Sequence, residues 1–177
     1  MMRLIDSHIV ESAMKKSLEL HWPRYGDLQV SHELVPLRAI TTAIPKVERE
    51  RFLRSTRLLA KYREANLPPF ITAEVGIPGS ASIVLSPFVE VHEQHLVLID
   101  GLHRALSLAA SGGSHIWALQ IRASQMPPAV GTLRYLSEVT VVDRPIEEAP
   151  FFEGRGYDDF RPSDLFTETA VSLIISG

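Results

Sequence analysis

Residues 100–104 (DGLHR) combine side chains that bind phosphate with a backbone turn that lets a phosphate approach. The apolar run 96–99 precedes them and an Ala- and Leu-rich segment follows, which predicts a buried strand that enters a helix. The first N–H groups of a helix have no intrahelical acceptor and carry partial positive charge, so anions bind there. Gly101 can adopt a positive φ and places no Cβ in the way of a ligand.

The neighbouring side chains add further contacts. Arg104 can donate two parallel hydrogen bonds to phosphate oxygens, and His103 supplies another donor in the first helical turn. Asp100, at the end of the strand, could hold a metal ion, a ribose hydroxyl or an attacking group. Because Asp-Gly is also a common turn, and a histidine at a helix start is often an ordinary surface residue, these five residues alone leave both interpretations open.

Length and composition are those of an ordinary globular protein. The chain has 177 residues, 45% of them apolar and 22% charged, with a net charge of −3. No cysteine is present, which excludes disulfides, thiolate metal sites and cysteine nucleophiles. No segment approaches the roughly 20 apolar residues of a membrane span, and the N-terminus lacks the pattern of a signal peptide. We therefore expect a cytoplasmic protein with no membrane partner.

Hydrophobic periodicity predicts alternating strands and helices. Helices are expected over residues 4–20, 46–65 and 102–111, and strands over 32–40, 70–75, 88–91, 96–99 and 116–121. Pro36 either places the first of these strands at a sheet edge or shortens it. Residues 143–165 are expected to form an irregular segment packed on the core, and residues 169–176 a closing helix or strand. The fold class is α/β (α+β), a small mixed β-sheet with flanking helices.

The run VLIDGLHRALSLAASGGSHIWALQI resembles the core of the ParB/sulfiredoxin-like superfamily, in which a strand, a D-G-x-H-R turn, a helix and a further strand follow one another. The resemblance covers residues 32–122. It implies a nucleotide-binding core there, with an N-terminal helical extension over 1–31 and a C-terminal extension over 123–177 packed on the core.

The resemblance also implies residue roles. Gly101, His103 and Arg104 would contact nucleotide phosphates, and Asp100 would lie beside the transferred phosphoryl group or a metal ion. Leu102 stands where sulfiredoxins carry their catalytic cysteine, which excludes sulfiredoxin chemistry. Residues after 122 do not resemble the helix-turn-helix domain of partition proteins. The motif is closest to that of the free-serine kinases.

Kinases of this branch also use a glutamate soon after the first strand, and Glu48 and Glu50 are the best candidates for a base that accepts the hydroxyl proton. Both could instead be helix-start acids that complement the helix dipole. The same predicted helix is rich in basic residues, which could contact phosphates or form a solvated face paired with nearby acids. These basic residues are Lys46, Arg49, Arg51, Arg54, Arg57, Lys61 and Arg63.

Two functions fit these observations. The first is a phosphotransferase that uses Mg²⁺ with ATP, ADP or CTP and acts on a small hydroxylated substrate. The second is a non-catalytic nucleotide-binding or DNA-associated regulator. A nucleotide and a small molecule are the expected partners, nucleic acid is less favoured, and a homo-oligomer is compatible with the sequence.

Overall fold

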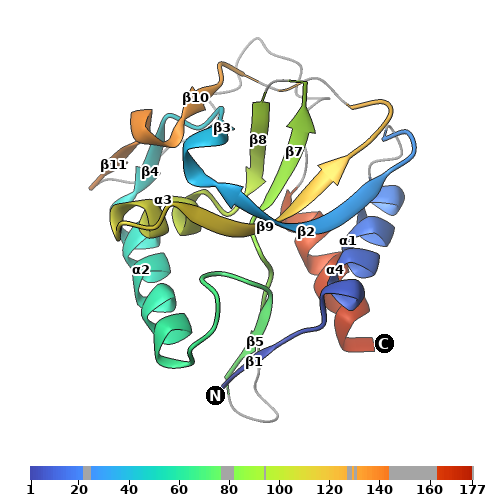
Figure 1. The fold of residues 1–177 in the computed structure, drawn as a ribbon, viewed down its shortest axis with the longest axis horizontal. Coiled ribbons are helices and arrows are strands. Elements are labelled where there is room, and N and C mark those ends of the chain that lie inside the picture. The colour runs from blue at the N-terminus through green and yellow to red at the C-terminus, as the bar shows by residue number, and fades with distance from the viewer. Residues whose placement is uncertain are drawn as a thin grey trace.

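A curved mixed sheet lies between two pairs of helices in the computed structural model (Figure 1). The structure describes residues 1–21, 25–76, 82–93, 95–126, 129, 131–143 and 163–176, with residues 163–165 described by their backbone alone. Most of the irregular segment expected over 143–165 lies outside these residues. The helices are α1 (Ser7–His21), α2 (Arg49–Glu64), α3 (Leu102–Ala110) and α4 (Ser163–Ser176), with the 3₁₀ turns η1 (Leu37–Ala39) and η2 (Leu136–Glu138).

Six strands form the main sheet in the order β10-β3-β8-β7-β9-β2. Pairs β3–β8 and β7–β9 are parallel and the other neighbours are antiparallel, which confirms the mixed α/β fold. The two smaller sheets are β1-β5-β6 and β11-β4. The strands are β1 (Met2–Leu4), β2 (Gln29–Pro36), β3 (Ile40–Thr42), β4 (Lys46–Glu48), β5 (Ala73–Val75), β6 (Ser82–Val84), β7 (Phe88–His92), β8 (His95–Asp100), β9 (His115–Arg122), β10 (Arg134–Tyr135) and β11 (Thr140–Val142).

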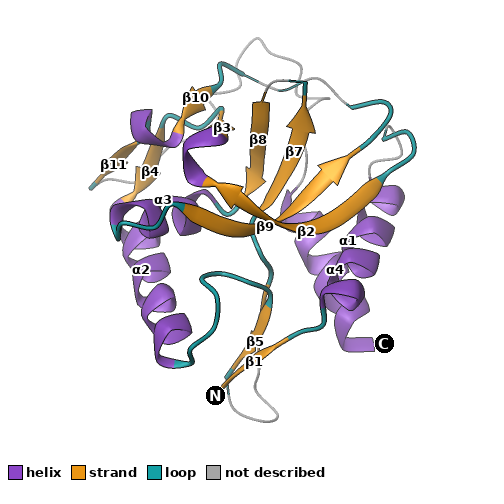
Figure 2. Ribbon diagram, viewed as in Figure 1, coloured by secondary structure: helices purple, strands orange, loops and turns teal. Residues whose placement is uncertain are grey.

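Each face of the sheet buries its own apolar core, and Figure 2 shows α2 with α3 at the left of the molecule and α1 with α4 at the right. Helices α2 and α3 cover one core and α1 and α4 the other. Alternation along a strand decides which side chain faces which core: Val89 belongs to the first and Phe88 to the second. Strand β8, apolar on both faces, lies inside the sheet as its sequence predicts.

Several expected boundaries are wrong. Residues 46–48, expected to begin a helix, instead form β4, because they pair in parallel with β11 and the helix begins only at Arg49. The strand expected over 70–75 is shortened to β5, since Phe70 adopts a φ of 58°. In α1, Ile9 is exposed and Val10 lies in the core instead. Pro36 does mark an edge strand, because β2 ends the main sheet.

None of the described helices is long and apolar enough to cross a membrane.

Candidate functional site

The turn between β8 and α3 is tight and requires glycine. Gly101 adopts a φ of 94° immediately before Leu102 begins the helix. A Cβ on Gly101 would lie 2.6 Å from the Cβ of Pro87 and 2.9 Å from its Cα. The strand-to-helix turn therefore packs directly on the segment that precedes β7, and only a residue without a side chain fits.

Arg104 is fixed by two acceptors on either side of this turn. Its Nη2 donates to Asp100 Oδ2 at 2.6 Å, and its Nη1 donates to the backbone carbonyl of Leu85. The Arg104 side chain is 14% exposed and that of Asp100 31%, so both groups remain accessible at the edge of the core. One guanidinium thus joins the start of α3, the end of β8 and the segment before β7.

These residues open onto a cavity of about 360 Å³. Its apolar wall comes from Leu58 of α2 and from the adjoining residues 83–85. Its polar lining comes from three helices and the turn, and consists of Arg54, Ser55, Asp100, Gly101, His103, Arg104 and Thr167. The structure therefore brings the four predicted residues of the 100–104 turn together in one cavity and adds Arg54 to them.

The electrostatic surroundings keep His103 neutral near pH 7. Burial lowers the pKa of His103, and the Arg51 guanidinium lowers it further, while the carboxylates of Glu48 and Asp100 act in the opposite direction. A neutral imidazole has one donor and one acceptor nitrogen, so it can receive a proton when an anion approaches.

The two glutamates singled out from the sequence occupy different positions. Glu48 lies at the start of α2 within electrostatic reach of His103, and its Oε2 is 3.3 Å from Arg51 Nε. Glu50 is 71% exposed and pairs with Arg54, which itself lines the cavity. Glu48 is therefore the carboxylate closer to the turn, whereas Glu50 orients a cation of the cavity wall.

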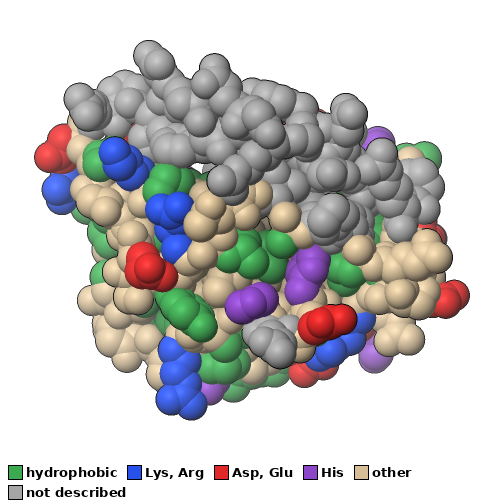
Figure 3. All heavy atoms as spheres, turned by 90° about the horizontal axis from the view of Figure 1, so that it is seen from above, with side chains coloured by type: hydrophobic (Ala, Val, Ile, Leu, Met, Phe, Trp, Pro, Cys, Tyr) green, Lys and Arg blue, Asp and Glu red, His purple; other side chains and the backbone are tan. Residues whose placement is uncertain are grey.

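The basic side chains of α2 are largely engaged. Arg49 pairs with Asp143, and Arg63 Nη2 donates to Ser111 Oγ at 2.9 Å, in addition to the two pairs just described. The face of the molecule seen in Figure 3 carries basic and acidic side chains interspersed on its described surface, with no continuous basic patch. The pairing of the α2 side chains favours a solvated charged helix, with Arg54 lining the cavity.

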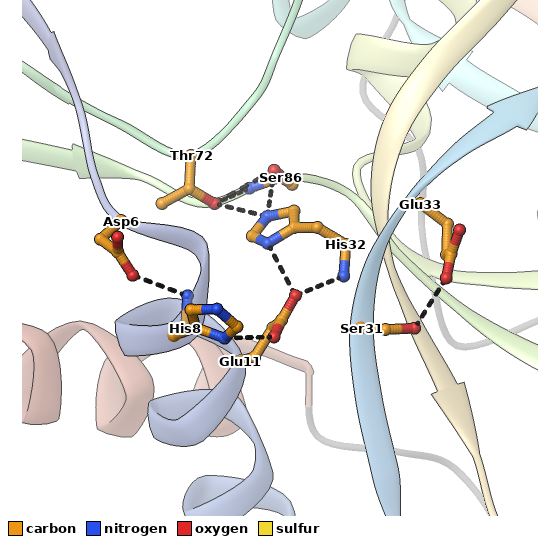
Figure 4. A network of polar contacts seen from close by, with 8 residues as sticks. All are labelled: Asp6, His8, Glu11, Ser31, His32, Glu33, Thr72 and Ser86. Atoms are coloured by element: carbon orange, nitrogen blue, oxygen red, sulfur yellow. Dashed lines mark hydrogen bonds and ion pairs between the residues drawn. The ribbon is translucent and has the colours of Figure 1, made fainter.

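Sequence reasoning missed a polar network next to the cavity (Figure 4). His32 Nε2 lies 3.1 Å from Ser86 Oγ, which is 3.0 Å from Thr72 Oγ1. The backbone N–H of His32 donates to Glu11 Oε1 at 2.8 Å, and that carboxylate lies 3.7 Å from His32 Nδ1. Burial lowers the pKa of His32, against the opposing influence of Glu11. Ser86 immediately follows Leu85, so the network fixes the segment that accepts the Arg104 hydrogen bond.

The Ser–His–Glu order of this network has the composition of a hydrolytic triad, but its geometry does not suit one. Ser86 and Thr72 have no exposed surface, and their hydroxyls already bond to each other. A nucleophile must reach its substrate, so the network acts as a structural link between α1, β2 and the segment before β7.

His92 and His95 lie at the β7–β8 hairpin. His92 Nε2 is 2.9 Å from the buried Glu90 Oε2, and Glu90 also accepts a hydrogen bond from Tyr25. Within the described residues, no three histidine, aspartate or glutamate side chains gather as metal ligands.

The sequence indicated some of the residues around the 100–104 cavity but not others. Arg54 belongs to the basic helix that the sequence indicated, although spacing alone could not distinguish it from Arg57. Leu85 contributes a backbone carbonyl and Thr167 comes from the far end of the chain. No residue type or spacing marks such groups, because their roles depend on tertiary contacts.

No protein-family model matches this chain, and no curated protein is significantly similar to it. A comparison with solved structures finds protein Atu1540 from Agrobacterium tumefaciens, with a TM-score of 0.34 and 11% sequence identity. That match covers 70% of this chain and 46% of the other, so this chain spans less than half the length of that protein. A similarity at this level supports no conclusion about function.

Proposed function

We propose that this protein binds the phosphates of a nucleotide at residues 100–104 and transfers a phosphoryl group to a small hydroxylated substrate. One observation carries the proposal: a single cavity holds the N-terminus of α3, the glycine turn, His103 and the cations Arg54 and Arg104. Helix N–H groups, a neutral imidazole and two guanidiniums are the donors that phosphate oxygens prefer.

Positioning of the substrate hydroxyl against the terminal phosphoryl group would account for most of the expected catalysis. In phosphoryl transfer the substrate hydroxyl oxygen forms a bond to the terminal phosphorus as the bond to the nucleotide leaving oxygen breaks, and the hydroxyl proton must be accepted by a base. We assign that base to Glu48, because its carboxylate acts on His103 at the edge of the cavity. Arg54 and Arg104 would stabilise the charge on the transferring group.

Mg²⁺ would fit this site if one protein carboxylate and the nucleotide phosphates held it together. It is usually held by one or two protein carboxylates and by substrate phosphates, with water completing the shell. Asp100 supplies one carboxylate within the cavity, so Asp100 would hold the ion, which would neutralise charge on the phosphates of ATP, ADP or CTP. The cytoplasm supplies both Mg²⁺ and nucleotides, and we place the protein there.

A second function remains as the alternative: a non-catalytic nucleotide-binding or DNA-associated regulator. The observation in its favour is the set of exposed cations on or beside α2 that have no partner among the described residues, namely Lys46, Arg57 and Lys61. Salt-sensitive DNA binding would support this alternative.

Titration calorimetry with ATP, ADP and CTP, each with Mg²⁺, tests binding. Arg54→Ala should weaken nucleotide binding about tenfold, since a charged hydrogen bond contributes about 1.5–3 kcal/mol. Arg57→Ala, on the same helix but outside the cavity, is the matched control and should change affinity less than twofold. Equal effects of the two substitutions would refute the assigned site.

Phosphorus NMR and mass spectrometry of reactions with serine and related hydroxy acids test transfer. Glu48→Gln should abolish the phosphorylated product while nucleotide affinity stays within about threefold. Nucleotide binding without any product from the unaltered protein would favour the regulator and remove Glu48 from its role.

A further inference from the structure

A second cavity, of about 780 Å³, lies against the C-terminal half of α3. It is bounded by η1, the start of β9, η2 and β11, and Figure 1 shows β10, β11 and α3 together at the left of the molecule. Its volume falls within the roughly 300–1,000 Å³ of cavities that hold small molecules. It shares no lining residue with the cavity at residues 100–104, so the two are separate sites.

The floor of this cavity is apolar. Leu106 and Leu136 belong to the core, and Phe52, Val139 and Val141 pack against that core while still facing the cavity. Each square ångström of apolar surface withdrawn from water contributes about 25 cal/mol. A ligand with an apolar body would therefore bind here with a substantial hydrophobic contribution.

Cationic and donor groups lie along the rim, whereas none of the described lining residues is acidic. Arg38 is exposed, and no hydrogen bond or ion pair engages it within the part of the chain that the structure describes. Ser114 Oγ lies 3.0 Å from His115 Nδ1. When the hydroxyl donates to Nδ1, the proton of the neutral ring sits on Nε2, which is then a donor.

Backbone pairing brings Arg38 and His115 onto adjoining segments. Pro36 is the register partner of His115 between β2 and β9, and the Leu37 N–H donates to the Ser114 carbonyl at 2.9 Å. The backbone segments that carry Arg38 and His115 therefore adjoin at one end of the cavity, and both residues line it. Two donors on adjoining segments, with no carboxylate among the described lining residues, suit an anionic group.

We propose that this cavity binds a small amphipathic anion: a molecule with an aromatic or branched aliphatic body and one carboxylate or equivalent anionic group, held by Arg38 and His115. The apolar body lies on Leu106, Leu136 and Phe52, and the anionic group reaches the rim. The inference stands apart from nucleotide binding, since it uses none of the residues at 100–104.

Anilinonaphthalene sulfonate, which joins an aromatic body to a sulfonate, is a suitable probe for the full-length chain. Its fluorescence should rise and saturate at one site per chain. 1-Naphthoate should displace it, whereas 1-naphthalenemethanol, which has the same ring system but no charge, should be at least tenfold weaker. Equal displacement by both compounds would overturn the anionic specificity.

Two pairs of substitutions test the location. Arg38→Ala should weaken probe binding about tenfold, and Arg57→Ala should not change it. Ala109→Phe places a ring at an exposed helix position that lines the cavity, and should reduce binding at least tenfold; Ala60→Phe, at an exposed position of α2 outside it, should not. Thermal melts confirm that all four variants are folded. Probe binding that is absent, or the same in all four folded variants, would overturn the proposal.

Discussion

Replacing Gly101 with alanine tests whether the turn of the proposed phosphate site is as tight as its geometry indicates. The new Cβ would lie 2.6 Å from the Cβ of Pro87 and 2.9 Å from its Cα, distances that two carbon atoms do not tolerate. The residue would also have to keep a φ of 94°, which an L side chain rarely adopts. Gly101→Ala should therefore destabilise the fold through two separate costs.

The magnitudes can be worked out from these two costs. A left-handed backbone costs a non-glycine residue about 1–2 kcal/mol, and overpacking in a close contact costs about 1–3 kcal/mol. Their sum is about 2–5 kcal/mol, which corresponds to a fall in melting temperature of about 4–20 °C for a domain of this size.

Gly112→Ala is the matched control. Gly112 also has a positive φ, of 84°, but no atom lies within 4 Å of the position of its Cβ. It should show only the backbone cost, about 1–2 kcal/mol. Urea unfolding followed by circular dichroism measures both variants. If Gly101→Ala is no more destabilising than Gly112→Ala, the packing of the turn on Pro87 is too loose to define the proposed site.

Three further predictions concern titratable groups. In the absence of Mg²⁺, Asp100→Asn should raise the affinity for inorganic phosphate about fivefold, because the amide neither repels the anion nor competes as strongly for Arg104. Calorimetry measures this affinity, and unchanged or weaker binding would contradict the prediction. Phosphate binding should take up a proton near pH 7, because the pKa of His103 is lowered in the free protein and a bound anion raises it. The affinity for phosphate should therefore increase as the pH falls. Calorimetry in buffers of different ionisation enthalpy measures the proton uptake, and His103→Gln should remove it. Burial raises the pKa of Tyr62 to about 12, and its hydroxyl donates to the Ile71 carbonyl at 2.6 Å. The folded state therefore holds the Tyr62 proton more tightly than the unfolded chain, so stability should fall as the pH rises from about 10 towards 12. Tyr62→Phe should lower the free energy of unfolding by about 1–3 kcal/mol at pH 7, and its stability should fall less between about pH 10 and 12 than that of the unaltered protein. If the stability of this variant falls as much over that range, another group is responsible.

Elements with strong local signals could be predicted from the sequence. The apolar run 96–99 predicted a buried strand, and the Ala- and Leu-rich segment after Gly101 predicted a helix; both are confirmed. These signals depend on neighbours within a few residues, where the geometry of a strand, a helix or a turn is nearly fixed.

Elements that depend on a distant partner could not be predicted. Residues 46–48 read as the start of a helix, because basic and acidic residues continue into α2, yet pairing with β11 makes them a strand. Likewise, only the packing of α1 on α4 and the sheet decides that Val10, and not Ile9, is buried. A pattern of apolar residues indicates that a face is buried but does not identify what covers it.

For the candidate site, the sequence by itself indicated the residues at 100–104, a glycine able to adopt a positive φ at 101 and the strand-to-helix order, which the structure confirms. Only the tertiary structure decided that Arg54, Leu85 and Thr167 meet them around one cavity, and that Glu48 acts electrostatically on His103 while Glu50 pairs with Arg54. The physical reason is that a local turn is specified by the few dihedral angles of its own residues, whereas a cavity is formed where segments distant in sequence pack together.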